Sequence, residues 1–218
     1  MEPDSPHATG LVLAAGQGRR MGVPKALLRT DDETWAARAV RLLLEGGCRS
    51  VMVVTGAAHE EVEDHLPDDD RVCHVHAPRW EEGMGESLRT GLDYLVHAAK
   101  GEPHRPAIDP PGDAALVTLV DLPDLDAQVV ARVLERWAAG GEGDQALLRA
   151  TYDGRPGHPV LLGSAHWRRL LTVVRGDVGA QRYFDLDDDH PPARRLHEVD
   201  CTDLATGRDV DTPAELDS

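Results

Sequence analysis

The sequence predicts an α/β fold, a three-layer sandwich in which helices cover both faces of a mostly parallel sheet. Apolar runs at residues 11–14, 51–54, 72–75 and 115–120 have the length and composition of buried parallel strands. The segments between them carry apolar residues at helical spacing, so strands and helices alternate along the chain. A length of 218 residues fits a single domain over residues 1–218 and leaves little room for a second.

The remaining elements follow from local composition. Helical spacing and stop signals predict helices over residues 34–44, 59–66, 84–97 and 126–138. Further strands are expected at 147–150, after the turn within 152–162, and at 196–199. Polar, glycine-rich or proline-rich composition predicts a disordered tail at 1–8, a mobile loop at 98–113 and a solvated acidic loop at 186–190.

Charge and cysteine content restrict the class of protein. Asp and Glu number 39 against 23 Lys and Arg, which gives a net charge of −16. Such an acidic chain has no general affinity for nucleic acid or for an anionic membrane, so we expect neither as a partner. Three scattered cysteines predict reduced thiols and a cytoplasmic location, and no apolar run has the length of a membrane span.

A glycine-rich and basic loop follows the first apolar run. Residues 16–25 read Gly-Gln-Gly-Arg-Arg-Met-Gly-Val-Pro-Lys. Small residues let a phosphate approach backbone N–H groups, and the cations neutralise its charge. Lys25 is one of two lysines in the chain, which favours a compact point charge at this position. The loop therefore predicts a site for the triphosphate of a nucleotide, with a plain glycine turn and solvated arginines as the alternative.

Two common phosphate-binding motifs do not fit this loop. The P-loop ends in Gly-Lys-Ser/Thr, whereas Gly22 is followed by Val23. The dinucleotide fingerprint Gly-x-Gly-x-x-Gly needs glycine at position 21, which is Met21 in this chain. The mismatch, together with the arginines, argues against a dinucleotide-dependent oxidoreductase.

Two further segments carry candidate ligand groups. Gly83 and Gly85 lead into a helix with Ser87 in its first turn, and free N–H groups at such an entrance favour a phosphate or carboxylate. An ordinary cap explains the same residues. Asp121 follows the most apolar strand, at the edge of an open α/β sheet where ligands bind. Its carboxylate would pair with a divalent cation or cap the next helix.

Residues 13–25 resemble the signature Leu-Ala-Ala-Gly-x-Gly-x-Arg-Met-Gly-x-x-Lys of the nucleotidyltransferases related to molybdenum cofactor cytidylyltransferase and molybdopterin-guanine dinucleotide synthase. Later segments at 80–91, 121–123, 152–162, 175–180 and 209–216 are similar to further motifs of the same group and occur in the same order. Ala14-Ala15-Gly16 and Pro24-Lys25 are closer to the cytidylyltransferase branch. The resemblance implies a Rossmann-like, GT-A-like nucleotidyltransferase fold.

The resemblance also implies roles for single residues. Arg19 would hold the outer phosphates, Lys25 would neutralise charge at the α-phosphate, and Asp121 would bind the catalytic Mg²⁺. Asp209 is the favoured second metal ligand, with Asp211 left open for that role. The expected nucleotide-binding residues are Leu13, Ala14, Ala15, Gly16, Gly18, Lys25, Gly85 and Ser87.

Three residues are candidates for binding the second substrate: His158, Asp177 and Asp211. Bracing of a turn explains His158 equally well, and capping of the next helix explains Asp177. The chain departs from the group's pattern at Leu122, Leu162 and Gln181, where the group usually has a polar residue or Met, an aromatic residue and Arg.

The reaction that the resemblance implies is attack by an acceptor phosphate on the α-phosphorus of a nucleoside triphosphate, with release of pyrophosphate. It favours CTP and the molybdopterin cofactor, with Mg²⁺. A phosphosugar, a phospho-alcohol or a phospho-acid is the alternative acceptor. A non-catalytic nucleotide-binding accessory protein is the alternative from another class, although such a protein would be expected to lose Lys25 or Asp121, and both are present.

Overall fold

A seven-stranded sheet, in the order β5-β4-β1-β6-β8-β7-β9, forms the centre of the computed structural model, which describes residues 7–100, 111–177, 179–185 and 196–215. The strands are β1 (Ala8–Ala14), β4 (Ser50–Thr55), β5 (Val72–His76), β6 (Ala114–Leu119), β7 (Leu147–Tyr152), β8 (Arg155–Gly163) and β9 (His197–Asp200). Within this sheet only β8 runs antiparallel to its neighbours, β6 and β7. The predicted mostly parallel sheet is confirmed.

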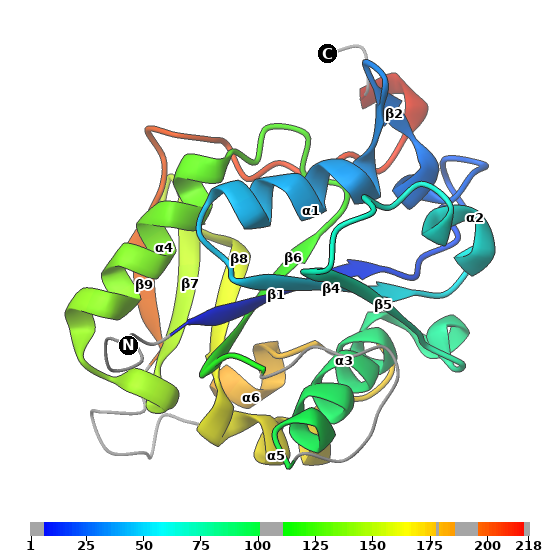
Figure 1. The fold of residues 1–218 in the computed structure, drawn as a ribbon. Helices are drawn as coiled ribbons and strands as arrows, with labels where there is room; N and C mark the ends of the chain where they lie inside the picture. Colours follow the sequence, from blue (N-terminus) through cyan, green and yellow to red (C-terminus); the bar gives the residue numbers. More distant parts are fainter. Residues whose placement is uncertain (1–6, 101–110, 178, 186–195, 216–218) are drawn as a thin grey trace.

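Helices cover both faces of the sheet (Figure 1). On one face lie α1 (Trp35–Glu45) and α4 (Ala127–Gly140), and on the other lie α3 (Met84–Ala98), α5 (Ser164–Val173) and the short α6 (Gln181–Asp185). A short helix, α2 (His59–Glu63), follows β4, and a small hairpin of β2 (Arg29–Thr30) and β3 (Glu33–Thr34) precedes α1. This is the three-layer sandwich that the alternation of elements predicted.

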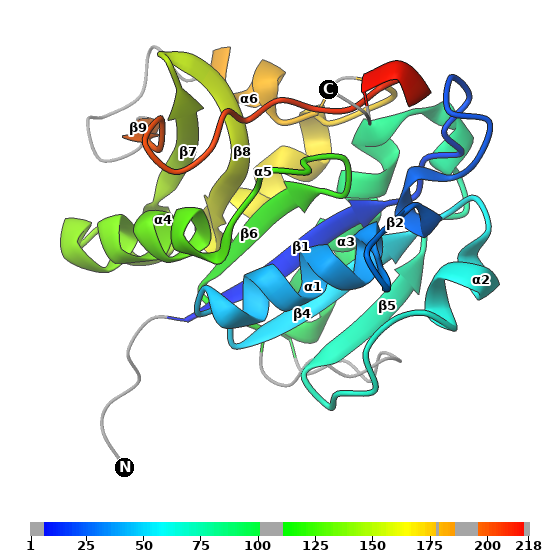
Figure 2. The same cartoon turned by 90° about the horizontal axis from the view of Figure 1, so that it is seen from above.

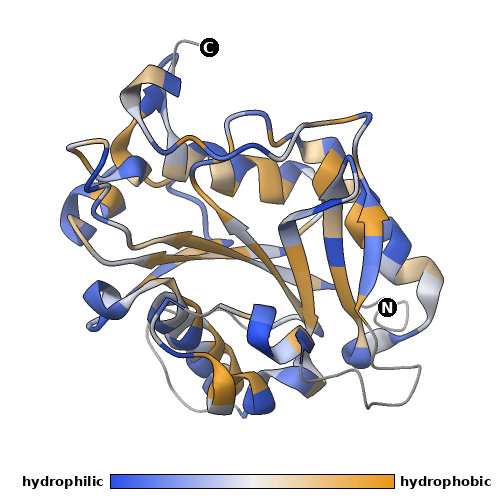
Figure 3. Cartoon of the chain, turned by 180° about the vertical axis from the view of Figure 1, so that it is seen from behind, coloured by the Kyte–Doolittle hydropathy of each residue, from blue (hydrophilic) through white to orange (hydrophobic). Residues whose placement is uncertain are grey.

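The central strand β1 divides its side chains between two apolar cores. Val12 and Ala14 pack in the core beneath α1 and α4, whereas Leu11 and Leu13 pack in the core beneath α3 and α5. This division follows from the period of two in a strand. Figure 3 shows the apolar strands enclosed by helices with polar outer surfaces. Burying each Leu or Val contributes about 1.5–3 kcal/mol, so β1 is firmly fixed and its last residue gives the following loop a rigid start.

The first residues of two predicted helices cap these helices with their side chains. The Thr34 hydroxyl accepts a hydrogen bond from Ala37 N (3.2 Å) at the start of α1. The Asp126 carboxylate accepts one from Gln128 N (2.7 Å) at the start of α4. By contrast, α3 begins after Gly83, at a φ of 123°, with no side-chain cap. At this helix start, the backbone N–H of Gly85 instead donates a hydrogen bond to the carbonyl oxygen of Gly176.

Several boundaries differ from the sequence-based prediction. Ala8 is the first residue of β1 and is buried, because it pairs with Ala114 of β6, so the expected tail is shorter than residues 1–8. The helix expected over 59–66 ends at Glu63. The acidic run 186–190 and most of the expected loop 98–113 lie outside the described residues. Within the part of the chain that the structure describes, no helix is long and apolar enough to cross a membrane.

Candidate active site

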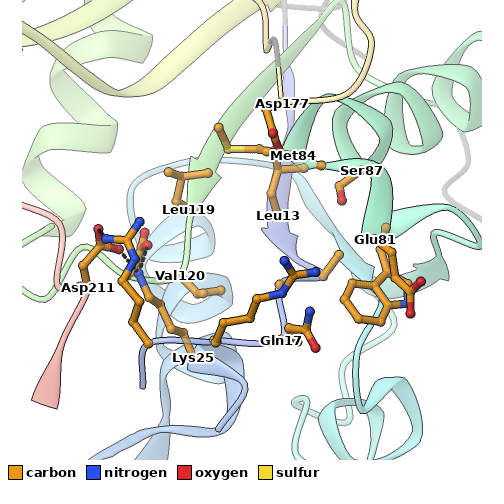
Figure 4. A pocket seen from close by; sticks show the side chains of 18 residues that line it. Leu13, Gln17, Lys25, Glu81, Met84, Ser87, Leu119, Val120, Asp177 and Asp211 are labelled. Carbon is orange, nitrogen blue, oxygen red and sulfur yellow. Dashed lines mark hydrogen bonds and ion pairs between the residues drawn. The ribbon is translucent and has the colours of Figure 1, made fainter. Parts of the chain in front are cut away.

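A cavity of about 490 Å³ opens at the carboxyl ends of β1 and β6, the edge where ligands bind in open α/β sheets. The loop after β1 forms one wall, and the segment that enters α3 forms another. In Figure 4, Lys25 and Asp211 lie at one end, Glu81 lies at the other, and Leu13 and Met84 lie between. The lining residues are Leu13, Ala15, Gly16, Gln17, Gly18, Arg19, Arg20, Lys25, Trp80, Glu81, Gly83, Met84, Ser87, Leu119, Val120, Asp121, Asp177 and Asp211.

Lys25 joins two carboxylates at one end of this cavity. Its Nζ donates to Asp121 Oδ2 (2.8 Å) and to Asp211 Oδ1 (2.7 Å). Arg20 Nη1 lies 2.5 Å from the other oxygen of Asp211. Burial alone would lower the pKa of Lys25, but the hydrogen bonds to the two carboxylates outweigh it and raise the pKa. The hydrogen bond from Lys25 in turn lowers the pKa of Asp211, so Lys25 and Asp211 are both charged at neutral pH.

The turn that carries Asp121 is held from two sides. Arg38 of α1 donates to the carbonyl oxygens of Leu122 (3.1 Å) and Leu125 (2.8 Å). The carbonyl oxygen of Asp121 accepts from Val210 N at 3.0 Å. These bonds fix the backbone at the end of β6, so the Asp121 carboxylate is aimed into the cavity by its surroundings.

The C-terminal segment brings Asp211 to the same place. Glu215 Oε2 accepts hydrogen bonds from the backbone N of Asp211 and of Thr212, both at 2.8 Å. This caps the 3-10 turn Pro213–Glu215 and fixes the residues before it. Figure 2 shows this turn, in red, beside the blue loop that follows β1. Two ends of the chain thus build one charged cluster.

The glycine loop is tight at one glycine and open at another. Gly18 has a φ of +60°, and a Cβ there would lie 1.9 Å from Val23 O, so this position requires glycine. Gly18 O accepts from Met21 N and Gly22 N, both at 2.9 Å, which closes the loop. A Cβ on Gly16 would meet nothing within 4 Å, which leaves space for a ligand. Arg19 is exposed beside it, with no ion pair to a carboxylate within the described chain.

Two carboxylates at this end of the cavity are the candidate ligands for a divalent cation. Asp121 Oδ1 is buried and has no hydrogen-bond partner within the described residues, which is a costly state for a carboxylate oxygen. Asp121 and Asp211 offer the hard oxygen atoms that Mg²⁺ and Mn²⁺ prefer. No three His, Cys, Asp or Glu side chains gather as a metal cage among the residues described. A cation here would need further oxygen atoms from phosphates and water, as is common for Mg²⁺.

A second cavity of about 320 Å³ adjoins the first and shares Leu13, Met84 and Asp177 with it. His158 lines this second cavity rather than the first. Because β8 is antiparallel to β6, its early residues lie beside the end of β6, so His158 approaches Asp121. Burial lowers the pKa of His158 to about 4, although the charges of Asp121 and Asp209 raise it. The imidazole is therefore neutral at physiological pH.

Three residues that were predicted to bind the nucleotide or the metal do not line the first cavity. Ala14 is buried in the core beneath α1 and α4, because the alternation along β1 points it away from the cavity. The N–H of Gly85 is already used, since it donates to Gly176 O at 2.7 Å. Asp209 is exposed and does not line the first cavity, but its charge acts on His158 of the second; its neighbour Asp211 is the one that contacts Lys25. Sequence spacing could not choose between two aspartates two positions apart.

Other residues of the site were not predicted. Arg38 lies on a helix whose other face is apolar, and nothing in its spacing signals the turn that it holds. Trp80 stood within a quoted motif without an assigned role, and Arg20 was expected only as one of the loop cations near phosphate, not as a partner of Asp211. Arg149 had a usable signal, because a lone arginine inside the apolar run 147–152 is unusual for a buried strand.

Residues 10–194 match the model of the MobA-like NTP transferase domain. The chain belongs to this family. It is a nucleotidyltransferase of the MobA-like type, and the predicted family resemblance is confirmed.

Similar proteins carry different names. The chain is 31% identical to nicotine blue oxidoreductase of Paenarthrobacter nicotinovorans over 219 residues, covering 99% of this chain and 97% of that protein. It is 23% identical to molybdenum cofactor cytidylyltransferase of Escherichia coli strain K12, covering 94% and 92%. Among solved structures, Rv0371c from Mycobacterium tuberculosis H37Rv has a TM-score of 0.73 at 23% identity, covering 98% and 97%. A manganese complex of Rv0371c has a TM-score of 0.65 at 22% identity, covering 97% and 96%. These structures show the shared fold.

Proposed function

We propose that this protein transfers a nucleoside monophosphate from a nucleoside triphosphate to a phosphorylated acceptor and releases pyrophosphate. CTP is the favoured nucleotide and molybdopterin the favoured acceptor, in a cytoplasmic setting. The observation that carries the proposal is the contact of Lys25 with both Asp121 and Asp211 beside a loop that leaves room at Gly16. The match to a molybdenum cofactor cytidylyltransferase along most of the chain supports the choice of substrates.

The loop and its cations would bind the triphosphate. A Cβ on Gly16 would meet nothing within 4 Å, so a phosphate oxygen has room to approach the backbone there. Arg19, which has no carboxylate partner in the described chain, is available for the outer phosphates. Lys25 would neutralise the charge that develops at the α-phosphate, and its hydrogen bonds to Asp121 and Asp211 support this role by keeping it protonated.

Asp121 and Asp211 would hold a divalent cation, Mg²⁺ or Mn²⁺, against the phosphates. The unpartnered Asp121 Oδ1 supports this assignment, as does the manganese complex of a protein with the same fold. When bound, such a cation neutralises charge on the phosphate oxygens. We favour Asp211 over Asp209 as the second ligand because Asp211 shares Lys25 with Asp121.

The proposed reaction needs no dedicated general base, because a phosphate acceptor is already ionised at neutral pH. One acceptor oxygen forms a bond to the α-phosphorus while the bond from that phosphorus to the α–β bridging oxygen breaks. The electron pair of the broken bond leaves on pyrophosphate, so atoms and charges balance. Positioning and charge stabilisation carry such a step. Asp177, at the wall shared by the two cavities, would contact the substrates where they meet.

The direct test is pyrophosphate release with Mg²⁺ or Mn²⁺, using CTP, GTP, ATP and UTP, each with and without molybdopterin. We expect release with CTP and molybdopterin together. Release with a different acceptor, such as a phosphosugar, would retain the chemistry and change the substrate. If no acceptor gave release and calorimetry found no nucleotide binding, the proposal would be refuted.

A second candidate function is oxidoreduction of a flat heteroaromatic compound. It is favoured by the 31% identity, over nearly the whole chain, to a protein named nicotine blue oxidoreductase. The dinucleotide-binding fingerprint is absent, because position 21 is Met21 and not glycine, and this argues against oxidoreduction. Consumption of NADH or NADPH in the presence of nicotine blue, measured by absorbance, separates the two candidates. Consumption without any nucleotide-dependent pyrophosphate release would favour oxidoreduction.

A further inference from the structure

Two side-chain cations hold three of the four carboxylate oxygens of Asp121 and Asp211. Lys25 Nζ donates to Asp121 Oδ2 (2.8 Å) and to Asp211 Oδ1 (2.7 Å). Arg20 Nη1 pairs with Asp211 Oδ2 at 2.5 Å. The fourth oxygen, Asp121 Oδ1, is buried and has no hydrogen-bond partner among the residues described. A divalent cation that binds both aspartates must therefore use an oxygen of Asp211 that Lys25 or Arg20 now holds.

Lys25 is the cation that lies between the two carboxylates. It touches one oxygen of each aspartate, as a bridging metal ion would, whereas Arg20 touches Asp211 alone. The Lys25 side chain is 16% exposed and that of Arg20 is 72% exposed, so water screens the contacts of Lys25 less. A second cation on the same two oxygens would be strongly repelled at this position. Lys25 and a bridging metal ion therefore compete for the same carboxylates.

The charges of the cluster also disfavour a metal ion when no substrate is bound. The two carboxylates are already paired with one ammonium and one guanidinium. A divalent cation would add two positive charges to this balance and would gain little attraction in return. A bound triphosphate reverses the situation, because its negative charges attract both the ammonium and the metal ion. Lysine suits such a move, since it carries a compact charge on a flexible four-carbon stem.

We propose that Lys25 occupies the place of the divalent cation in the substrate-free protein, and that it leaves both carboxylates for the triphosphate when the metal ion binds. This inference rests on the proposed nucleotidyl transfer for the destination of the released ammonium. Metal ion and nucleotide then bind cooperatively, because each of them favours the release of Lys25 from Asp121 and Asp211. The exchange keeps metal affinity low until the nucleotide is present.

Mn²⁺ binding without nucleotide, measured by electron paramagnetic resonance, tests the competition. Lys25→Met should bind Mn²⁺ at least about tenfold more tightly than the wild-type protein, because the loss of a competing hydrogen bond between charged groups has this effect. Arg20→Met is the matched control. It removes one positive charge from Asp211 but leaves Lys25 between the aspartates, so its gain should be clearly smaller. Adding Asp211→Asn to Lys25→Met should abolish the gain, which would locate the bound ion in this cluster.

Lysine nuclear magnetic resonance distinguishes displacement of Lys25 from a simple change of charge. The chain has two lysines, so labelling the Cε atoms with ¹³C gives two side-chain signals, and Lys100→Met assigns them. Mg²⁺ is added without nucleotide to a concentration that saturates the site, as found by competition with Mn²⁺. The Lys25 signal should shift toward that of an exposed lysine, while the signal of the exposed Lys100 should stay in place.

The inference is overturned if Lys25→Met binds Mn²⁺ no more tightly than the wild-type protein or than Arg20→Met. It is also overturned if saturating Mg²⁺ leaves the Lys25 signal unmoved, a result that does not depend on the folding of any variant at this position. Far-ultraviolet circular dichroism checks the fold of each variant. Pyrophosphate release is measured in parallel. Displacement of Lys25 without release would count against the proposed transfer, and release with an unmoved Lys25 signal would count against the exchange alone.

Discussion

Lys25 Nζ donates a 2.8 Å hydrogen bond to Asp121 Oδ2, although the two residues are 96 positions apart in the chain. The contact joins the end of the glycine loop to the tip of β6. It brings together a cation that would act on the α-phosphate and a carboxylate that would hold a metal. The first predictions concern this cluster.

Replacing Lys25 with Met should lower the rate of pyrophosphate release by roughly 10²–10³-fold, the cost of losing one preorganised donor to developing charge. The matched control is Lys100→Met, the only other lysine, which should retain full activity. Turnover is measured at saturating CTP and acceptor, with nucleotide affinity from calorimetry. Equal activity of the two variants would remove Lys25 from the catalytic site.

The two C-terminal aspartates should differ in their effect on metal dependence. Asp211→Asn should raise the Mn²⁺ concentration for half-maximal activity at least about tenfold, because it removes a carboxylate ligand. Asp209→Asn should change this concentration little, since Asp209 lies outside the cavity lining. Mn²⁺ titrations of the activity of both variants show which aspartate binds the metal. A larger effect from Asp209→Asn would mean that Asp209, as favoured from the sequence, is the second metal ligand.

Alanine substitutions at two glycines of the loop should have different effects, one on stability and the other on CTP binding. Gly18→Ala should lower the melting temperature, since Cβ would clash with Val23 O in a backbone with positive φ. Gly16→Ala should leave the melting temperature unchanged, since its Cβ meets only open space. It should instead weaken CTP binding by about tenfold, as the methyl group enters the space proposed for phosphate. Normal CTP affinity in a folded Gly16→Ala protein would move the triphosphate away from this loop.

The turn that bears Asp121 depends on Arg38. Arg38→Met should lower the free energy of unfolding by about 1–3 kcal/mol, because two carbonyl oxygens lose their partner. It should also lower turnover, since Asp121 is no longer held. Arg41→Met, on the exposed side of the same helix, is the control and should change each quantity little. Urea denaturation and pyrophosphate release measure the two effects.

Stability should fall with acid through His158. Burial lowers its pKa to about 4 in the folded protein, against 6.5 for an ordinary histidine. Between these pH values the unfolded chain binds more protons, so the contribution of His158 is present above pH 6.5 and is lost as pH falls toward 4. His158→Gln should reduce the slope of unfolding free energy against pH in this window. An unchanged slope would show that other groups govern acid stability.

Much of the fold was predictable because its strands are continuous apolar runs. Strands β1, β4 and β6 are buried on both faces, and their sequences carry no competing helical pattern. Helix α5 was missed because its buried residues are few, Trp167 and Leu170 among them, and two arginines separate these two. The reversed direction of β8 was also not predicted, since periodicity gives no strand direction.

The candidate site was predictable where function leaves a local signature and unpredictable where it depends on packing. The glycine loop and the Asp121 turn are contiguous in sequence, so both were identified. The choice of Asp211 depends on the capping of its backbone by Glu215, and the importance of Arg38 depends on the crossing of α1 over the end of β6. Such contacts arise only when distant segments meet.

The reversed strand β8 contributes to the wall of the second cavity and not to that of the first. The glycine loop, the Asp121 turn and the C-terminal segment line the first cavity, and residues of β7, β8 and the segment around Ala180 make much of the wall of the second. Because Leu13, Met84 and Asp177 line both cavities, a substitution at any one of these three positions reshapes both at once.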